Sequence, residues 1–260
     1  MENNDAINPF YRAFSESSYV DRINSPSRSD TYFHKFHRPL IEEAKKTAGT
    51  VKVLDLACGH GHEMDFLSTD PSVQLYGMDI STETLRSSTR KRLGGAHLIA
   101  GDTGHSPIAD NSMDVGIAVN AVVYKPDQML KTLFSALKPG GRCSVNFRVF
   151  SNKHNERFYD YYLERGCTLT DQELLAGGKT FILKVLDYRN CTEEVYRNLD
   201  RQVYFQSTAD IERLARTIGF EVDRHQYFHF ASPVNQDNEV DVYWFKKPWI
   251  PPDYPKTEPR

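Results

Sequence analysis

From Val51 onward, the chain alternates short apolar runs with longer stretches in which apolar residues recur every three or four positions. A short apolar run bounded by turn residues predicts a buried strand, and the longer recurrence predicts an amphipathic helix. Strands that alternate with helices need crossover connections, so we expect a parallel sheet covered by helices on both faces. The predicted strands are Val51–Ala57, Val73–Asp79, Ala96–Gly101, Met113–Asn120 and Arg142–Phe147, with helices at about 61–68, 81–92 and 126–138.

The helix predicted at 126–138 has the clearest signal. Leu130, Leu133, Phe134 and Leu137 stand at i, i+3, i+4 and i+7, which is one face of a helix. The glycines at 140 and 141 follow directly, and we expect them to end this helix.

The regular alternation stops after Phe147 and resumes at Ser207. Residues 148–206 are rich in Tyr, Arg and Asn and contain two predicted strands, Thr180–Tyr188 and Glu194–Phe205. Such a break inside an otherwise regular pattern indicates an insertion late in the sheet.

The last part of the chain returns to the α/β rhythm. Ser207 and Asp210 form a capping-box-like start of a helix, and Gly219 is placed to end it. The runs Phe220–Phe230 and Val240–Lys246 then predict the last two strands.

An amphipathic stretch, Thr31–Lys46, precedes the first strand. Asp30 is a plausible N-cap, and Pro39 is expected to kink or interrupt the helix. We therefore divide the chain into an N-terminal helical segment (1–48), a core (49–147), an insertion (148–206), and the C-terminal part of the core sheet with a proline-rich tail (207–260).

Composition restricts the function classes. A net charge of −3 over 260 residues gives no chain-wide basic field for a nucleic-acid backbone. No run approaches the ~20 apolar residues of a membrane helix, and the first residues lack the layout of a signal peptide. The four cysteines form no CxxC pair, so their spacing indicates neither a disulfide framework nor a zinc site. We expect a cytoplasmic protein that binds neither nucleic acid nor membrane, and the pattern carries no signal for an oligomeric state.

The stretch 53–61, VLDLACGHG, is the main candidate for a binding site. A buried strand runs directly into a Gly-x-Gly turn, Gly59 to Gly61, and then into a helix. Glycines let the backbone pass close to a ligand, and ligands of open α/β sheets bind beyond the carboxyl ends of the strands.

Acidic residues follow the next two strands. Asp79 stands 18 residues after Gly61, where a carboxylate accepts hydrogen bonds from both hydroxyls of a ribose. Gly101 and Asp102 end the third strand, where a carboxylate is placed to receive an adenine amino group. Either aspartate alone would be explained as a helix cap or turn residue, but three signals on successive strand ends favour a nucleoside site.

These motifs resemble the class I S-adenosylmethionine-dependent methyltransferases, especially their small-molecule branch. The matching segments are VLDLACGHGHEM, YGMDIS, GDTGHSPIADNSMDV and KPDQMLKTLFSALKPGGR, and the resemblance covers residues 50–147 closely and 207–246 in outline. It implies a Rossmann-like, seven-stranded, mostly parallel sheet with the last strand antiparallel, an N-terminal helical lid and an inserted substrate cover. The family often has glycine where this chain has Ala57.

The resemblance also implies site residues for S-adenosylmethionine and its product S-adenosylhomocysteine. Its methionine part would be lined by the turn after the first strand, its ribose and adenine by the ends of the next two strands, and its underside by the end of the fourth. The N-terminal segment, with Tyr19 and His37, would fold over the cofactor, and Tyr19 would contact the methionine carboxylate. The implied residues are Asp55, Ala57, Cys58, Gly59, Gly61, Asp79, Ile80, Gly101, Asp102, Thr103, Asn120, Ala121 and Tyr19.

For the acceptor, the resemblance points to residues after the fourth and fifth strands. Tyr124 is expected to orient the acceptor, because a phenol with a pKa of ~10 is a poor base; packing under the insertion is an equally good interpretation. Arg148 would bind an anionic group on the acceptor or lie on a solvated strand face. His154 lies in the same region, and His229 would point into the pocket or pack against the sheet. His60, inside the turn, is as well explained by solvent exposure as by catalysis.

We therefore predict methyl transfer from S-adenosylmethionine to an oxygen or nitrogen atom, in preference to carbon, of a small-molecule acceptor. A nicotinamide dehydrogenase is disfavoured because Met64 stands where the dinucleotide fingerprint has its third glycine. Base methylation is disfavoured because Asn120 is followed by Ala-Val-Val rather than by two prolines. The alternative from another class is a non-catalytic S-adenosylmethionine-binding protein, or one that uses the cofactor for a non-methylating reaction.

Overall fold

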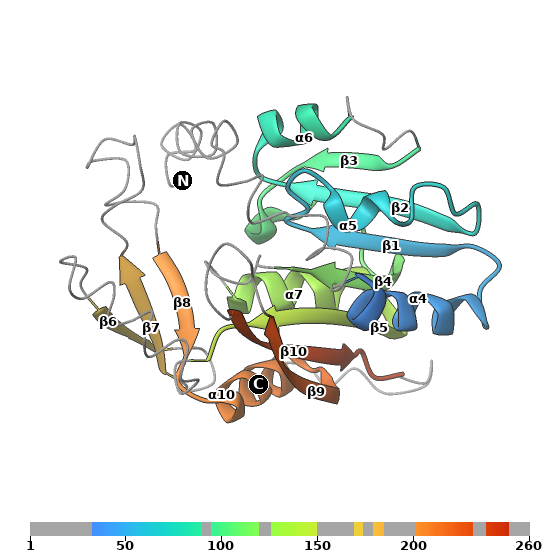
Figure 1. Ribbon diagram of the computed structural model, residues 1–260. Helices are drawn as coiled ribbons and strands as arrows, with labels where there is room; N and C mark the ends of the chain where they lie inside the picture. The colour runs from blue at the N-terminus through green and yellow to red at the C-terminus, as the bar shows by residue number, and fades with distance from the viewer. Residues whose placement is uncertain are drawn as a thin grey trace.

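The computed structural model describes residues 33–89, 95–119, 126–149, 169–173, 179–184, 201–230 and 238–249. Within them, seven strands form one sheet, parallel throughout except for the strand that is next to last in the order (Figure 1). The order is β3 (His97–Ala100), β2 (Val73–Asp79), β1 (Val51–Leu56), β4 (Met113–Ala118), β5 (Leu137–Phe147), β10 (Asn238–Lys246) and β9 (Glu221–Phe230). The antiparallel strand is β10, the last in the chain, so the predicted fold class is confirmed.

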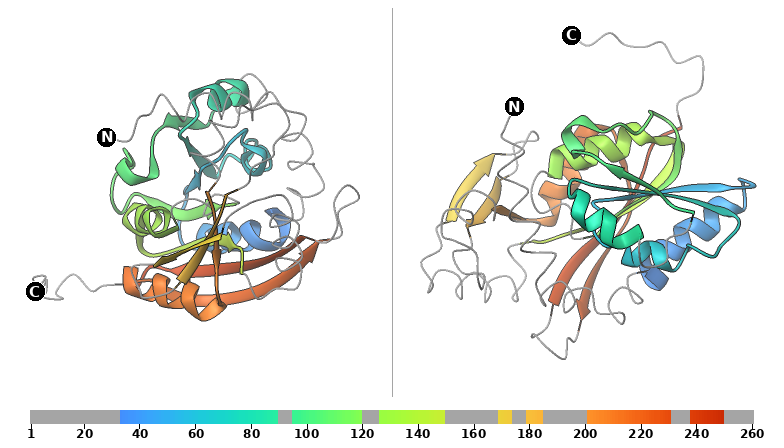
Figure 2. Two further views of the ribbon diagram at one scale, coloured as in Figure 1. Left: turned by 90° about the vertical axis from the view of Figure 1, so that its left-hand side faces the viewer. Right: turned by 90° about the horizontal axis from the view of Figure 1, so that it is seen from above.

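Helices cover both faces of this sheet (Figures 1 and 2). Side chains alternate along a strand, so β1 sends Val53 to one face and Leu54 to the other. The core on the side of Val53 includes Ile41 and Met64, whereas the core on the side of Leu54 includes Leu133. The first face carries α4 (Arg38–Lys45), α5 (His62–Asp65) and α6 (Thr82–Thr89), and the second carries α7 (Pro126–Ala136) and α10 (Thr208–Ile218).

The helix α10 has the two ends that its sequence predicts. Ser207 and Asp210 form a capping box, and Gly219 ends the helix in a left-handed conformation with φ of 115°. Ile211 and Leu214 are fully buried on its apolar face.

A second, antiparallel sheet lies within the predicted insertion (Figure 1). It consists of β6 (Leu169–Glu173), β7 (Lys179–Lys184) and β8 (Arg201–Phe205). The strand β8 falls inside the second predicted strand, and β7 overlaps the first but begins one residue earlier, whereas β6 has no sequence signal that we identified. A bridge from Val149 to Phe205 and the edge-to-face contact of Phe147 with Phe205 attach β8 to the end of β5.

The junction between α7 and β5 differs from the prediction. The helix ends at Ala136, and the glycines at 140 and 141 lie inside β5 instead of ending the helix. Backbone N–H groups of Asn111 and Ser112 donate to the carbonyls of Ser135 and Ala136, so the chain before β4 satisfies the end of the helix. The glycines belong to an irregularity in the pairing of β4 with β5.

The predicted helix Thr31–Lys46 is divided in two. A short π-helix, η1 (Phe33–His37), precedes α4, and Pro39 stands in the first turn of α4, where a missing N–H costs nothing. His37 is buried, and its Nδ1 lies 2.6 Å from Ser144 Oγ on β5. The expectation that His37 belongs to a cover over the cofactor is wrong, because this residue packs against a face of the sheet. Tyr19 lies outside the described residues, as does the rest of the predicted lid before residue 33.

Burial of His37 predicts a pH-dependent stability. Burial lowers the pKa of His37 from its ordinary value of 6.5 to about 3. Between these values the unfolded chain binds a proton that the folded chain excludes. The stability that His37 contributes is therefore fully present above pH 6.5, and the free energy of unfolding decreases as the pH falls below this value. Urea unfolding at several pH values measures this effect. Between pH 6.5 and 5, we expect His37 to lower the free energy of unfolding by up to about 1.4 kcal/mol for each pH unit. In His37→Asn, the free energy of unfolding should depend less on pH over this range. An unchanged dependence would show that His37 does not cause it.

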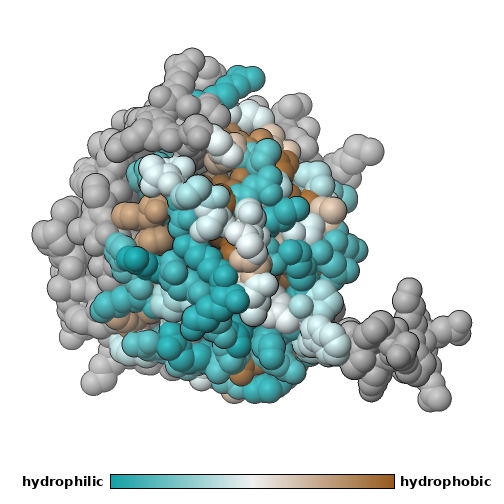
Figure 3. All heavy atoms as spheres, turned by 90° about the vertical axis from the view of Figure 1, so that its right-hand side faces the viewer, coloured by the Kyte–Doolittle hydropathy of each residue, from teal (hydrophilic) through white to brown (hydrophobic). Residues whose placement is uncertain are grey.

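The surface near the amino ends of the strands is mostly hydrophilic, with small hydrophobic areas between polar residues (Figure 3). None of the helices in the described part of the chain has the length and apolar content that a membrane crossing requires.

Candidate functional site

The turn after β1 is built from left-handed backbone. Ala57, Gly59 and Gly61 all have positive φ, at 58°, 53° and 72°. The Gly61 N–H donates to the carbonyl of Cys58 at 2.8 Å, which closes the turn directly before α5. Alanine at 57 carries the strain that glycine avoids in the left-handed region, which explains why glycine is favoured there. An added Cβ at Gly59 would meet no atom within 4 Å, so the turn leaves open space beside its backbone.

Asp79 joins this turn to the end of β2. Its Oδ2 accepts from the Gly59 N–H, and its Oδ1 accepts from the Ser81 N–H, both at 2.9 Å. A carboxylate accepts up to about four hydrogen bonds, so Asp79 keeps acceptor capacity for a ligand. Asp79 is 9% exposed, and burial raises the pKa of its carboxyl although these backbone hydrogen bonds lower it. The side chain therefore fixes the turn as well as offering acceptors at the strand end.

The third element follows β3. The Gly101 N–H donates to the carbonyl of Asp79 at 3.0 Å, which sets this loop beside the end of β2. Asp102 is half-buried, and one of its oxygens, Oδ1, caps the 3-10 turn η2 (Thr103–His105) through the Gly104 N–H. Its other oxygen, Oδ2, remains the candidate acceptor for the predicted adenine contact.

The site is strongly acidic. Asp55, at the end of β1, is 3% exposed, and within the described residues its Oδ2 has no hydrogen-bond partner. Burial, then Glu63, then Asp79 raise the pKa of Asp55 well above its usual range. Burial and the same carboxylates also raise the pKa of the Cys58 thiol. The segments 55–66, 76–85 and 99–106 contain six acidic residues and no lysine or arginine, so the cradle favours a ligand that carries positive charge.

The predicted cofactor residues that the structure describes thus lie together at the carboxyl ends of β1, β2 and β3. Two contacts were not predicted from the sequence: the proximity of Glu63 to Asp55, and Ser81, which donates to Asp79 and caps α6 through its Oγ. The residues of the described part that come together are Asp55, Ala57, Cys58, Gly59, Gly61, Asp79, Ile80, Gly101, Asp102 and Thr103.

The acceptor-side predictions are only partly placed. Arg148 is half-buried directly after β5, and its carbonyl accepts from the Phe205 N–H. The backbone of His229 pairs with Glu239 in a part of β9 and β10 that extends beyond the last β5 partner, Phe147. Of all the predicted site residues, five lie outside the described residues: Tyr19, Asn120, Ala121, Tyr124 and His154.

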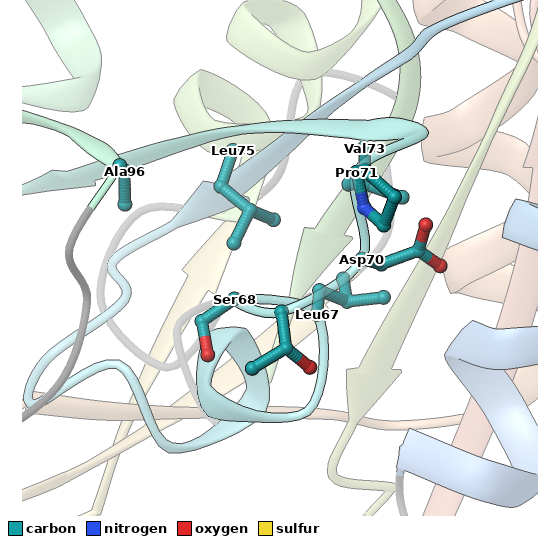
Figure 4. A pocket seen from close by; sticks show the side chains of 9 residues that line it. Leu67, Ser68, Asp70, Pro71, Val73, Leu75 and Ala96 are labelled. Carbon is teal, nitrogen blue, oxygen red and sulfur yellow. The ribbon is translucent and has the colours of Figure 1, made fainter.

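A pocket with a volume of about 220 Å³ lies at the other end of the strands (Figure 4). Its lining includes Val73 and Leu75 of β2, Pro71 before it and Ala96 before β3. Typical ligand sites have about 300–1,000 Å³ and lie beyond the carboxyl ends of the strands. This pocket is smaller and lies at the amino ends, so we do not assign the predicted cofactor to it.

Comparison with known proteins identifies a methyltransferase domain in this chain. Residues 53–141 match the family described as "Methyltransferase domain". The chain is 28% identical to a sterol 4-C-methyltransferase of Caenorhabditis elegans over 61% of its own length and 52% of that protein. It is 33% identical to a demethylmenaquinone methyltransferase of Paenarthrobacter aurescens over 42% of its length and 43% of that protein. The chain thus spans about half the length of the curated relatives that it matches.

Solved structures share the fold. A SAM-dependent methyltransferase from Methanosarcina mazei superimposes with a TM-score of 0.60 and 18% identity, over 82% of this chain and 98% of that one. At this identity, the likeness concerns the fold alone.

Proposed function

Because this chain belongs to the class I S-adenosylmethionine-dependent methyltransferases, with residues 53–141 as its matched domain, we propose that it methylates a small-molecule acceptor. The acceptor atom in this proposal is oxygen or nitrogen, in preference to carbon. The observation that carries the proposal is the buried Asp55 carboxyl, whose Oδ2 has no partner in the described residues, under an open, lysine-free turn. Such a cradle fits a ligand with a sulfonium and an ammonium group.

In this proposal, each part of the cofactor has its own set of residues. The turn from Ala57 to Gly61 and the Asp55 carboxyl would hold the methionine part, which carries the positive charges. Asp79 would accept hydrogen bonds from the ribose hydroxyls through the carboxylate lone pairs that do not accept from backbone N–H groups. Ile80 would cover the adenine face. Asp102 and Thr103 would face the adenine edge, with Asn120 and Ala121 below. Tyr19 would contact the methionine carboxylate.

When bound, the cofactor supplies a methyl group on a positively charged sulfur, which is open to in-line displacement. The protein's own contribution is to align the acceptor with that methyl group and to exclude water. Orientation of this kind can supply about 7–11 kcal/mol of the barrier. An oxygen acceptor would also need a base for its proton, whereas a neutral amine would not.

The acceptor would lie between the carboxyl edge of the large sheet and the sheet β6–β7–β8. Phe205 of β8 contacts Phe147 of β5, so the inserted sheet is attached to the end of β5 through its strand β8. Arg148 would then bind an anionic group of the acceptor, Tyr124 would orient it, and His154 and His229 would supply polar contacts or take a proton.

A turnover assay tests this proposal. The protein is incubated with methyl-labelled S-adenosylmethionine and a panel of amines, phenols and carboxylates, together with sterols and quinols because of the named relatives. We expect acceptor-dependent release of S-adenosylhomocysteine with at least one class. Tight cofactor binding without turnover across the panel would contradict the proposal and favour the alternative, a non-catalytic or non-methylating cofactor-binding protein.

A further inference from the structure

Asp55 occupies an unusual position for a charged group. It lies near the carboxyl end of β1, an inner strand of the large sheet, with Gly77 of β2 and Ile117 of β4 as its neighbours in register. Alternation along β1 places its side chain on the face of Val53, which α5 covers. The side chain is buried, and its Oδ2 has no hydrogen-bond partner within the described residues. Burial without a partner strongly disfavours an ionised carboxylate, so such a group takes up a proton instead.

The groups around Asp55 act in the same direction. Glu63 on α5 and Asp79 on β2 are carboxylates, and their negative charges oppose a further negative charge at Asp55. The Cys58 thiol, close to the same carboxylates, is held neutral by burial and by their charge. The two histidines of the turn, His60 and His62, are half-buried and lie with their rings 6.2 Å apart. They are the remaining titratable groups of the turn, so any test has to separate them from Asp55.

Nucleoside ligands of different charge would meet this buried acid differently. S-adenosylmethionine carries a sulfonium, an ammonium and a carboxylate. S-adenosylhomocysteine has only the ammonium and the carboxylate, and 5′-methylthioadenosine has no charge. Positive charge close to a buried carboxyl favours its ionised form.

Resting on the proposed function, we propose that Asp55 exchanges a proton for the positive charge of the cofactor, and that this exchange makes the site selective for the sulfonium substrate over its thioether product. The carboxyl O–H bond breaks as the ligand binds, its electron pair stays on the carboxylate, and the proton passes to the solvent. The product, with one positive charge less, holds the ionised form less strongly, so a proton returns to Asp55 after transfer. Asp55 thereby promotes release of the product.

Calorimetry measures this exchange directly. Binding of each of the three nucleosides is titrated at one pH in two buffers of different ionisation enthalpy, which gives the number of protons released. We expect release to decrease from S-adenosylmethionine to S-adenosylhomocysteine and to be absent for 5′-methylthioadenosine. The affinity for S-adenosylmethionine should rise with pH, by up to about tenfold per unit for one released proton. Equal release with all three ligands would overturn the inference.

Two variants identify the group. In Asp55→Asn, whose side chain is a neutral match for the protonated acid, proton release should disappear and the preference for S-adenosylmethionine over 5′-methylthioadenosine should fall. In the double variant His60→Asn, His62→Asn, the release should persist; its loss there would assign the proton to the histidines and overturn the inference. The ligand series in the natural protein decides the question even if Asp55→Asn does not fold. Failure of all three nucleosides to bind would instead refute the proposed function.

Discussion

Asp79→Asn is expected to weaken S-adenosylmethionine binding by about 1–3 kcal/mol, and the same loss is expected for Asp79→Ala. Asparagine has nearly the shape of aspartate, but only one of its two terminal atoms accepts a hydrogen bond. Asp79 accepts from Gly59 through one oxygen and from Ser81 through the other, so either orientation of the amide sets an NH₂ group against a backbone N–H. The substitution therefore disturbs the turn and removes the charged acceptor of the ribose hydroxyls together.

Isothermal titration calorimetry measures this effect, with Asp70→Asn as the matched control. Asp70 also accepts from a backbone N–H, that of Ser72, and it pairs with Lys45 at 2.6 Å, but it lies before β2, at the amino ends of the strands. We expect the affinity of the control for the cofactor to equal that of the natural protein. Unaltered affinity in Asp79→Asn would show that the ribose assignment is wrong.

Lys247→Met is expected to lower the free energy of unfolding by about 3 kcal/mol, since each buried acceptor left without a donor costs about 1–3 kcal/mol. Lys247 is 7% exposed, and its Nζ donates to Asn111 Oδ1 at 2.8 Å and to the carbonyls of Phe134 and Leu137 at 2.7 and 2.8 Å. These contacts use all three protons of the ammonium group. They join the residue after β10 to the end of α7 and the start of β5. Methionine keeps most of the apolar stem and removes every donor.

The neighbouring residue provides a control for this substitution. Lys246 is more exposed, and its Nζ lies 3.9 Å from a carboxylate oxygen of Glu221. An exposed ion pair of this kind contributes about 0–1 kcal/mol, so Lys246→Met should be almost neutral. Urea-induced unfolding compares the free energies of unfolding of the two variants. The dependence of this free energy on urea concentration should be the same in both, as two-state unfolding requires. If both variants unfolded at the same urea concentration, the network around Lys247 would not stabilise the fold as described.

The sequence pattern predicts the large sheet well where each strand is a short apolar run between turn residues. The predicted bounds of β2 match those in the structure, and β1 and β4 differ by one and two residues at their ends. The pattern fails at the end of α7, because a glycine cap is only one of the ways in which the last carbonyls of a helix can be satisfied. There, Asn111 and Ser112, far away in the sequence, donate to those carbonyls. No local pattern contains that information.

In the candidate site too, local motifs could be predicted from the sequence and tertiary contacts could not. The glycine turn and the acidic strand ends are local motifs, and their common edge follows from the parallel topology, so they could be predicted. The second role of Asp79 as an acceptor from Gly59 requires two separate strand ends at hydrogen-bond distance, which only the tertiary structure gives. The family resemblance implies that His37 belongs to a cover over the cofactor, whereas the structure pairs it with Ser144 inside the protein.

The central claim is that the carboxyl ends of β1, β2 and β3 together bind the adenosine of S-adenosylmethionine. A crystal structure with S-adenosylhomocysteine tests it most directly. The account predicts the ribose hydroxyls on Asp79, the adenine beside Asp102, and the homocysteine part along the turn at Gly59. Density for the nucleoside at any other place on the protein, or none at saturating concentration, would contradict it.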